Sequence, residues 1–103
     1  MNKVAFKMKL KPGFEAEYQR RHSQIWPELQ SLLKESGVSD YSIFLDEETL
    51  SLFAVQNQDG QSSQDLGDNI IVQKWWVYMA DIMETNPDFS PVSESLPLVF
   101  HMD

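Results

Sequence analysis

Hydrophobic and polar positions alternate at the start of the chain, which is the pattern of a β-strand with one buried face. Apolar residues occupy every second position from Val4 to Leu10, and lysines fill most of the positions between them. We therefore expect a strand over residues 3–10. The proline and glycine at residues 11–13 predict a turn directly after it.

The next apolar residues recur every three or four positions, from Phe14 to Leu33, which predicts one face of a helix. Pro27 interrupts this face. Proline lacks an amide hydrogen and disfavours helical backbone at the preceding residue, here Trp26. We expect a kink or break near Trp26, a second helical stretch opening at Pro27, and a left-handed cap at Gly37.

Two segments rich in β-forming residues follow, over residues 38–45 and 50–56, and the four residues 46–49 suit a hairpin loop between them. Residues 57–64 are polar and predict a loop. From residue 65 to residue 83 the apolar positions again follow a helical period, with a stripe wide enough for contacts on more than one side.

Residues 89–92 contain a proline and are expected to be irregular, and residues 96–102 predict a last short strand with Pro97 near its start. The order is β-α-β-β-α-β in a single domain covering residues 1–103. That order predicts an α+β, ferredoxin-like fold, with a four-stranded antiparallel sheet and the helices on one face. The bare opposite face favours a homodimer in which two sheets face each other.

The chain carries a net charge of −8 and its isoelectric point is about 4.5. A phosphate backbone or an anionic membrane would be repelled, so nucleic acid and membrane partners are not expected. Cysteine is absent, which excludes disulfides and thiolate metal sites. No apolar run is long enough for a membrane span, and the lysine-rich start does not resemble a signal peptide. These features predict a cytoplasmic protein.

His22 is the first candidate for chemistry, because it shares a helical face with Tyr18 one turn earlier. A lone histidine on such a face is usually an inert core residue. Imidazole is nevertheless the side chain that gives and takes protons near neutral pH, and an aromatic neighbour and a helix break accompany it here. His101 is a weaker candidate, since it alternates with apolar residues close to the C-terminus.

Aromatic residues form the second candidate group. Adjacent tryptophans are about 100° apart on a helix, so both cannot be pure core against one sheet. Either one packs on a loop or a partner, or the rings line a pocket suited to a sugar, with apolar faces and polar tips. Two interpretations of Asp81 are open: it belongs to a solvated helix face, or it is a second proton-transfer group. The aromatic group comprises Tyr18, Trp26, Tyr41, Trp75, Trp76 and Tyr78.

Motifs for other chemistries are missing from the sequence. There is no phosphate-binding glycine loop, no HExxH-type metal motif and no nucleophile elbow. We therefore expect no cofactor and no metal, and proton transfer by histidine is the chemistry that remains.

Several segments together resemble the L-rhamnose mutarotase family. They lie in the first helix, the second strand, the second helix with its following loop, and the C-terminus. The similarity covers nearly the whole chain and is weakest over residues 57–70. The matching segments are residues 17–22, 25–29, 41–46, 75–83, 86–88, 90–93 and 99–101.

This resemblance implies a dimeric α+β barrel built from ferredoxin-like protomers. It also implies cofactor-free interconversion of the α and β anomers of L-rhamnopyranose. Transferred by position, the family pattern makes His22 the proton donor, and it makes Tyr18, Tyr41, Trp75 and Trp76 the substrate contacts.

Two other interpretations stay open at this point. The same fold would suit a cofactor-less monooxygenase or a haem-degrading enzyme. A non-catalytic dimeric ligand-binding module would also fit. Replacing His22 with alanine separates the last of these from an enzyme, because a pure binder has no rate to lose.

Overall fold

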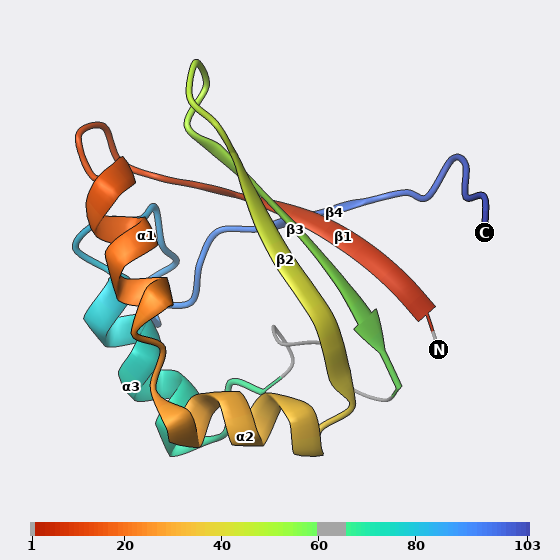
Figure 1. The fold of residues 1–103 in the computed structure, drawn as a ribbon. Coiled ribbons are helices and arrows are strands. Elements are labelled where there is room, and N and C mark those ends of the chain that lie inside the picture. The colour runs from red at the N-terminus through yellow and green to blue at the C-terminus, as the bar shows by residue number, and fades with distance from the viewer. Residues whose placement is uncertain (1, 60–65) are drawn as a thin grey trace.

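The structure, a computed structural model, describes residues 2–59 and 66–103, and Figure 1 shows the arrangement of their elements. Within these residues the chain forms one four-stranded sheet and three helices. In chain order the elements are β1 (Asn2–Lys9), α1 (Glu15–Ser23), α2 (Pro27–Glu35), β2 (Val38–Asp46), β3 (Ser51–Gln58), α3 (Ile70–Met79) and β4 (Glu94–Leu96).

The sheet has the strand order β2-β3-β1-β4, and every neighbouring pair is antiparallel. β1 pairs with β3 along its whole length, from Asn2 opposite Gln58 to Lys9 opposite Ser51. The short β4 pairs with the middle of β1. The three helices lie to one side of this sheet (Figure 1). The α+β class and the ferredoxin-like strand order expected from the sequence are therefore confirmed.

The core fills the layer between sheet and helices. Alternate residues of the two central strands are buried there, including Phe6 and Met8 of β1 and Leu52 and Ala54 of β3. The alternation read from the sequence of the first strand is thus the alternation of burial in β1. The strand itself ends one residue earlier than expected, at Lys9, and Leu10 forms an isolated bridge with Met83.

The break at Pro27 is confirmed. α1 ends at Ser23 and α2 begins at Pro27, while Trp26 has extended backbone with φ −62° and ψ 129°. This is the conformation that a following proline favours. The break turns the chain, so α1 and α2 run in different directions along the sheet (Figure 1).

Gly37 ends the second helical stretch with a φ of +95°, as expected for a left-handed cap. A second constraint acts on the same residue. A Cβ at Gly37 would overlap the carbonyl oxygen of Asp59, and the amide of Asp59 donates a hydrogen bond of 2.8 Å to the Gly37 carbonyl. Glycine is therefore required both by its dihedral angles and by the close approach of the end of β3.

The hairpin between β2 and β3 is confirmed, but the predicted loop after it is partly wrong. β3 continues through Gln58, because residues 57 and 58 still pair with both β1 and β2. Residue 59 follows the strand. Residues 60–64 of the predicted loop lie outside the described residues.

The predicted helix over residues 65–83 is too long; residue 65 lies outside the described residues. α3 begins at Ile70 because the side chain of Asn69 caps it, accepting a 2.8 Å hydrogen bond from the amide of Ile71. It ends at Met79 because the backbone beyond is bonded to the last residue of β1 and to Lys11, two residues further on. The Lys11 amide donates to the Ile82 carbonyl, and the Glu84 amide donates to the Lys9 carbonyl. The helical apolar period continues past the helix because Ile82 and Met83 remain buried.

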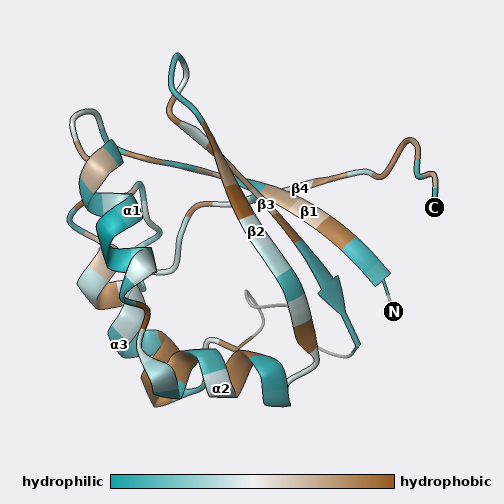
Figure 2. Ribbon diagram, viewed as in Figure 1, coloured by the Kyte–Doolittle hydropathy of each residue, from teal (hydrophilic) through white to brown (hydrophobic). Residues whose placement is uncertain are grey.

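The predicted last strand is present, but the bounds expected for it, residues 96–102, are wrong. β4 covers Glu94–Leu96, and Pro97 follows its end rather than opening it. Proline has no amide hydrogen to continue the ladder. Residues 97–103 have no regular structure, and Figure 2 colours much of this segment as hydrophobic where it extends away from the sheet. Val99 is 90% exposed there.

The sheet face opposite the helices is apolar at its centre. On this face Phe53 lies between Phe44 and Lys7, and Val55 lies between Ser42 and Ala5. Phe44 is 63% exposed. Among the described residues, no helix has the length and hydropathy needed to span a bilayer.

Candidate active site

Helix α1 brings Tyr18 and His22 together, one turn apart on the face that points at the sheet. Their rings stack with centroids 4.2 Å apart and an angle of 25° between the planes. His22 Nδ1 lies 3.0 Å from the backbone oxygen of Tyr18. Because a carbonyl oxygen accepts and cannot donate, Nδ1 carries the proton in this contact. In the neutral ring, Nε2 then holds the lone pair that exchanges protons.

The aromatic rings of α3 enclose the imidazole from the other side. Trp75 meets His22 edge to face, with centroids 5.5 Å apart and planes at 87°. Trp26 lies against both Trp75 and Tyr78, at centroid distances of 5.1 Å and 5.6 Å. Four rings from α1, α3 and the corner between α1 and α2 thus hold the imidazole and one another in place.

Both adjacent tryptophans are buried, each with 9% of its surface exposed. The expected 100° separation is accommodated because α3 is covered on more than one side. The Trp76 ring contacts the segment before the helix, where it lies within 3.1 Å of the position a Cβ would take at Gly67. Trp76 therefore packs on a loop and also lines a cavity, so the two alternatives weighed from the sequence are both present.

A cavity of about 530 Å³ lies between the helices and the sheet. Small-molecule sites commonly measure about 300–1,000 Å³, so a monosaccharide fits this volume. Its lining is mainly apolar, with phenol, imidazole and indole groups among the polar contributions. The five residues that the sequence argument assigned to catalysis and substrate binding all line it: Tyr18, His22, Tyr41, Trp75 and Trp76.

Burial sets the protonation of the two central groups. It lowers the pKa of His22 below its ordinary value, and the hydrogen bond to the Tyr18 carbonyl only partly opposes this effect. Burial also raises the pKa of Tyr18, with the nearby Tyr41 adding to the increase. At neutral pH the site therefore combines a neutral imidazole with a protonated phenol.

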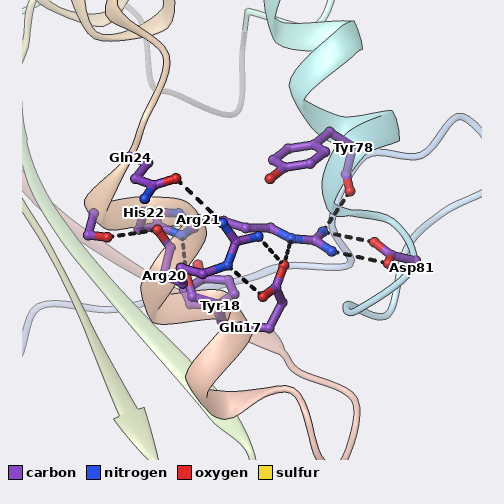
Figure 3. A network of polar contacts seen from close by, with 9 residues as sticks. Glu17, Tyr18, Arg20, Arg21, His22, Gln24, Tyr78 and Asp81 are labelled. Atoms are coloured by element: carbon purple, nitrogen blue, oxygen red, sulfur yellow. Dashed lines mark hydrogen bonds and ion pairs between the residues drawn. The ribbon is translucent and has the colours of Figure 1, made fainter.

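Asp81 does not line the cavity. Its carboxylate accepts two hydrogen bonds from Arg21, at 2.9 Å and 3.2 Å, and its side chain is 63% exposed (Figure 3). Arg21 lowers the pKa of this carboxyl. The structure thus pairs Asp81 with an arginine and does not bring it to the imidazole.

His101 is remote from this constellation. It lies in the C-terminal segment, where its Nε2 is 2.9 Å from a carboxylate oxygen of Asp103. It is absent from the cavity lining. The sequence argument, which ranked it below His22, agrees with this placement.

Sequence reasoning missed part of the cavity wall. Glu15 and Phe89 both line it. Phe89 belongs to the segment expected to be irregular, and its φ of +70° is unusual for a large side chain. The hydrogen bond from its amide to the Asn86 carbonyl, 2.9 Å long, holds this turn. No periodicity marks such a residue, since its direction depends on a turn rather than on a helix or strand.

In the described part of the chain, no group of three or more histidine, cysteine, aspartate or glutamate side chains is arranged to hold a metal ion.

The fold and the cavity define a small ferredoxin-like α+β protein with a cavity of about 530 Å³ that His22 lines. Comparison with known proteins narrows this class. The family model described as L-rhamnose mutarotase matches residues 3–102. The chain belongs to the L-rhamnose mutarotase family.

Individual relatives agree along the full chain. An L-rhamnose mutarotase from Bacteroides thetaiotaomicron is 66% identical, and one from Phocaeicola vulgatus is 64% identical; each alignment covers all of both chains. A crystal structure of an L-rhamnose mutarotase from Formosa agariphila superimposes with a TM-score of 0.94. Its sequence is 56% identical, and the match covers all of both chains.

Proposed function

We propose that this protein is an isomerase that interconverts the α and β anomers of L-rhamnopyranose, with His22 as the proton-transfer group. The observation that carries the proposal is the half-buried His22 imidazole, stacked on Tyr18 in a cavity of about 530 Å³. Family membership supports the activity, because the relatives at 56–66% identity are themselves L-rhamnose mutarotases. No cofactor is required for such a reaction.

Opening of the sugar ring requires two proton transfers. Nε2 of the neutral His22 takes the proton of the C1 hydroxyl, the bond between C1 and the ring oxygen breaks, and the ring oxygen receives a proton from the imidazolium. The product is the open-chain aldehyde. Rotation about the C1–C2 bond and the reverse steps close the ring with the other configuration at C1. Both oxygens are bonded to C1, so one imidazole can serve them in turn.

The surrounding rings supply binding rather than proton transfer. Trp75 and Trp76 offer apolar surfaces to the C–H groups of the sugar, while Tyr18 and Tyr41 offer phenol groups to its hydroxyls. Because its pKa is raised, Tyr18 stays protonated and acts as a hydrogen-bond donor. We assign these four residues as substrate contacts.

Saturation-transfer NMR on L-rhamnose tests the proposal. His22→Ala should lower the enzyme-dependent exchange between the anomers by about 10²–10⁴-fold, the usual contribution of general acid–base groups. His101→Ala is the matched control and should exchange like the wild type. Wild-type exchange in His22→Ala would refute the role of His22, and a wild-type protein without exchange would refute the function.

The same samples address the alternative activities. A haem enzyme would develop a Soret band when titrated with haemin, and we expect none. A pure binding module would bind L-rhamnose before and after the His22 substitution and would accelerate nothing.

We further propose that two chains form a homodimer, with the open sheet faces opposed in a dimeric α+β barrel. The apolar centre of that face, at Phe53 and Val55, supports this arrangement, as do the exposed apolar residues after β4. Phe53→Glu should give a monomer in sedimentation equilibrium, whereas the wild type should give a dimer. A monomeric wild type would refute the proposal. The cytoplasmic location stays a prediction from the sequence.

A further inference from the structure

Arg21 is a nearly buried arginine that joins helices α1 and α3 outside the cavity (Figure 3). Its side chain is 9% exposed. Nε donates to Glu17 at 2.7 Å, Nη1 donates to the backbone oxygen of Tyr78 at 2.8 Å, and both Nη atoms donate to Asp81. The guanidinium also lies 4.5 Å from the centre of the Tyr78 ring. A planar fork of five donors suits several partners at once.

These contacts link two particular helical turns. Arg21 directly precedes His22 in the last turn of α1. Tyr78, whose carbonyl it binds, follows Trp75 by three residues and therefore lies one turn along the same face of α3. The Tyr78 carbonyl belongs to the last turn of the helix, where carbonyls lack helical partners and a cation is favourable.

We propose that Arg21 is a positioning residue, which fixes the last turn of α1 against α3 so that His22 is held edge to face on Trp75. The claim rests on the proposed function for its consequence in catalysis. Its physical basis is independent: the guanidinium is a nearly buried polar connection between the two turns that carry these rings. Without it, the ring contacts and the hydrogen bond from Nδ1 to the Tyr18 carbonyl would set the position of the imidazole.

We call Arg21 and its partners Glu17, Tyr78 and Asp81 the clamp. Its charged members stay ionised over the pH range in which a histidine titrates. Hydrogen bonds from Arg20 and Arg21 lower the pKa of Glu17 to about 2. Arg21 lowers the pKa of Asp81 as well. The ion pairs of Arg21 with Glu17 and Asp81 should therefore persist between pH 5 and 8.

Arg20 provides a matched control. It neighbours Arg21 on the same helix and shares its partner Glu17, at 2.6 Å, but its side chain is 52% exposed. It also donates a hydrogen bond to Gln24, just beyond α1. The side chain of Tyr78 on α3 interacts with Arg20 as well and contributes, after Glu17, to raising the pKa of Arg20. It makes no hydrogen bond to Asp81 among the described contacts.

The test compares Arg21→Met with Arg20→Met in the full-length protein. We expect Arg21→Met to lower kcat for anomer exchange by about tenfold or more with a smaller change in KM, since a misplacement of about 1 Å can cost about 10²-fold. Arg20→Met should stay within about twofold of the wild type. Arg21→Lys keeps the charge but cannot reach three partners, so it should not restore kcat.

NMR titration of His22 separates positioning from a merely structural role. If the clamp holds the ring in place, Arg21→Met admits water beside it, and the pKa of His22 should rise toward its ordinary value. If Arg21 only stabilises the fold, thermal stability falls while the kcat of the folded fraction and the pKa of His22 stay unchanged, and the proposal is refuted. This readout does not depend on activity, so it holds even if the wild type shows no exchange.

Asp81→Ala covers the case in which Arg21→Met does not fold. Asp81 is exposed, so the fold should tolerate the change. Loss of its two hydrogen bonds should lower kcat in the same direction as Arg21→Met, by a smaller factor, and should raise the pKa of His22. A folded Asp81→Ala protein with wild-type kcat and an unchanged pKa would overturn the proposal.

Discussion

The two faces of the sheet differ in how completely their side chains are partnered. On the helix side, Trp75 contacts three other rings and a nearly buried arginine ties α1 to α3. On the other side, Phe44 is largely exposed and the apolar residues after β4 extend away from the protein. The helix-side face is packed by side chains of the same chain. The other face leaves apolar side chains exposed to solvent.

The largest effect on stability should come from the side chains packed on the helix side of the sheet. Trp75→Ala removes a buried indole and should lower the free energy of unfolding by about 3–5 kcal/mol, measured by urea denaturation. It should also lower exchange activity, because the ring contacts His22. Phe100→Ala, at a side chain that is 76% exposed, is the control. Within one chain it should change the free energy of unfolding by less than about 0.5 kcal/mol. An equal loss of unfolding free energy in the two variants would contradict the difference between the packed and the exposed side of the sheet.

Deleting residues 97–103 should act on the open face alone. This segment has no regular structure and makes no part of the cavity wall. We expect a weaker dimer, which dissociates on dilution at a protein concentration where the wild type is still dimeric, as measured by sedimentation equilibrium. Anomer exchange at saturating protein should stay near the wild-type rate. An abolished rate in the dimeric state would mean that the segment belongs to the site.

The pH dependence should follow His22. Because burial lowers its pKa, the neutral form dominates at pH 7, and protonation is resisted until the pH falls below about 6.5, the ordinary value. The exchange rate should therefore be flat from pH 7 to 8 and decline on acidification. The stability contributed by the neutral ring is present above pH 6.5 and is lost as the pH falls through the lowered pKa. A rate that rises on acidification would indicate that the imidazolium is the active form.

The smallest effect should come from the ion pair on the open face. Lys7 and Glu94 lie 3.1 Å apart, with side chains that are 43% and 68% exposed. Glu94→Gln should change the free energy of unfolding by about 0–1 kcal/mol, and high salt should diminish the difference. Substitution of Arg21 should lower the free energy of unfolding by more than this. The two results together compare a solvent-exposed ion pair with a largely buried one in the same protein.

The sequence predicted those features that depend on local periodicity. The alternation in β1, the break at Pro27 and the cap at Gly37 each follow from rules that act within a few residues. The five cavity residues were also found in advance, partly because Tyr18 and His22 are one turn apart and partly through the family resemblance. The role of Tyr41 as a substrate contact was predicted only from the family resemblance.

The missed features depend on contacts between distant segments. The end of α3 is set by two hydrogen bonds, one that Ile82 accepts from Lys11 and one that Glu84 donates to Lys9 of β1. β4 is short because it pairs only with the middle of β1. Asp81 was ambiguous because its partner, Arg21, is sixty positions away. Phe89 lines the cavity because a turn of the chain places it there. None of these pairings leaves a period in the sequence.

The proline at residue 27 has a consequence for how this family could acquire new ligands. Because successive helical residues are rotated by about 100°, moving the break by a single position would swing the Trp26 ring out from between Trp75 and Tyr78. Trp26 does not line the cavity, but its ring packs against Trp75, which does. Such a change would therefore alter the cavity wall through Trp75, while the histidine and tyrosine on α1 kept their stacking. The corner of the chain is thus a place where the shape of the cavity can diverge.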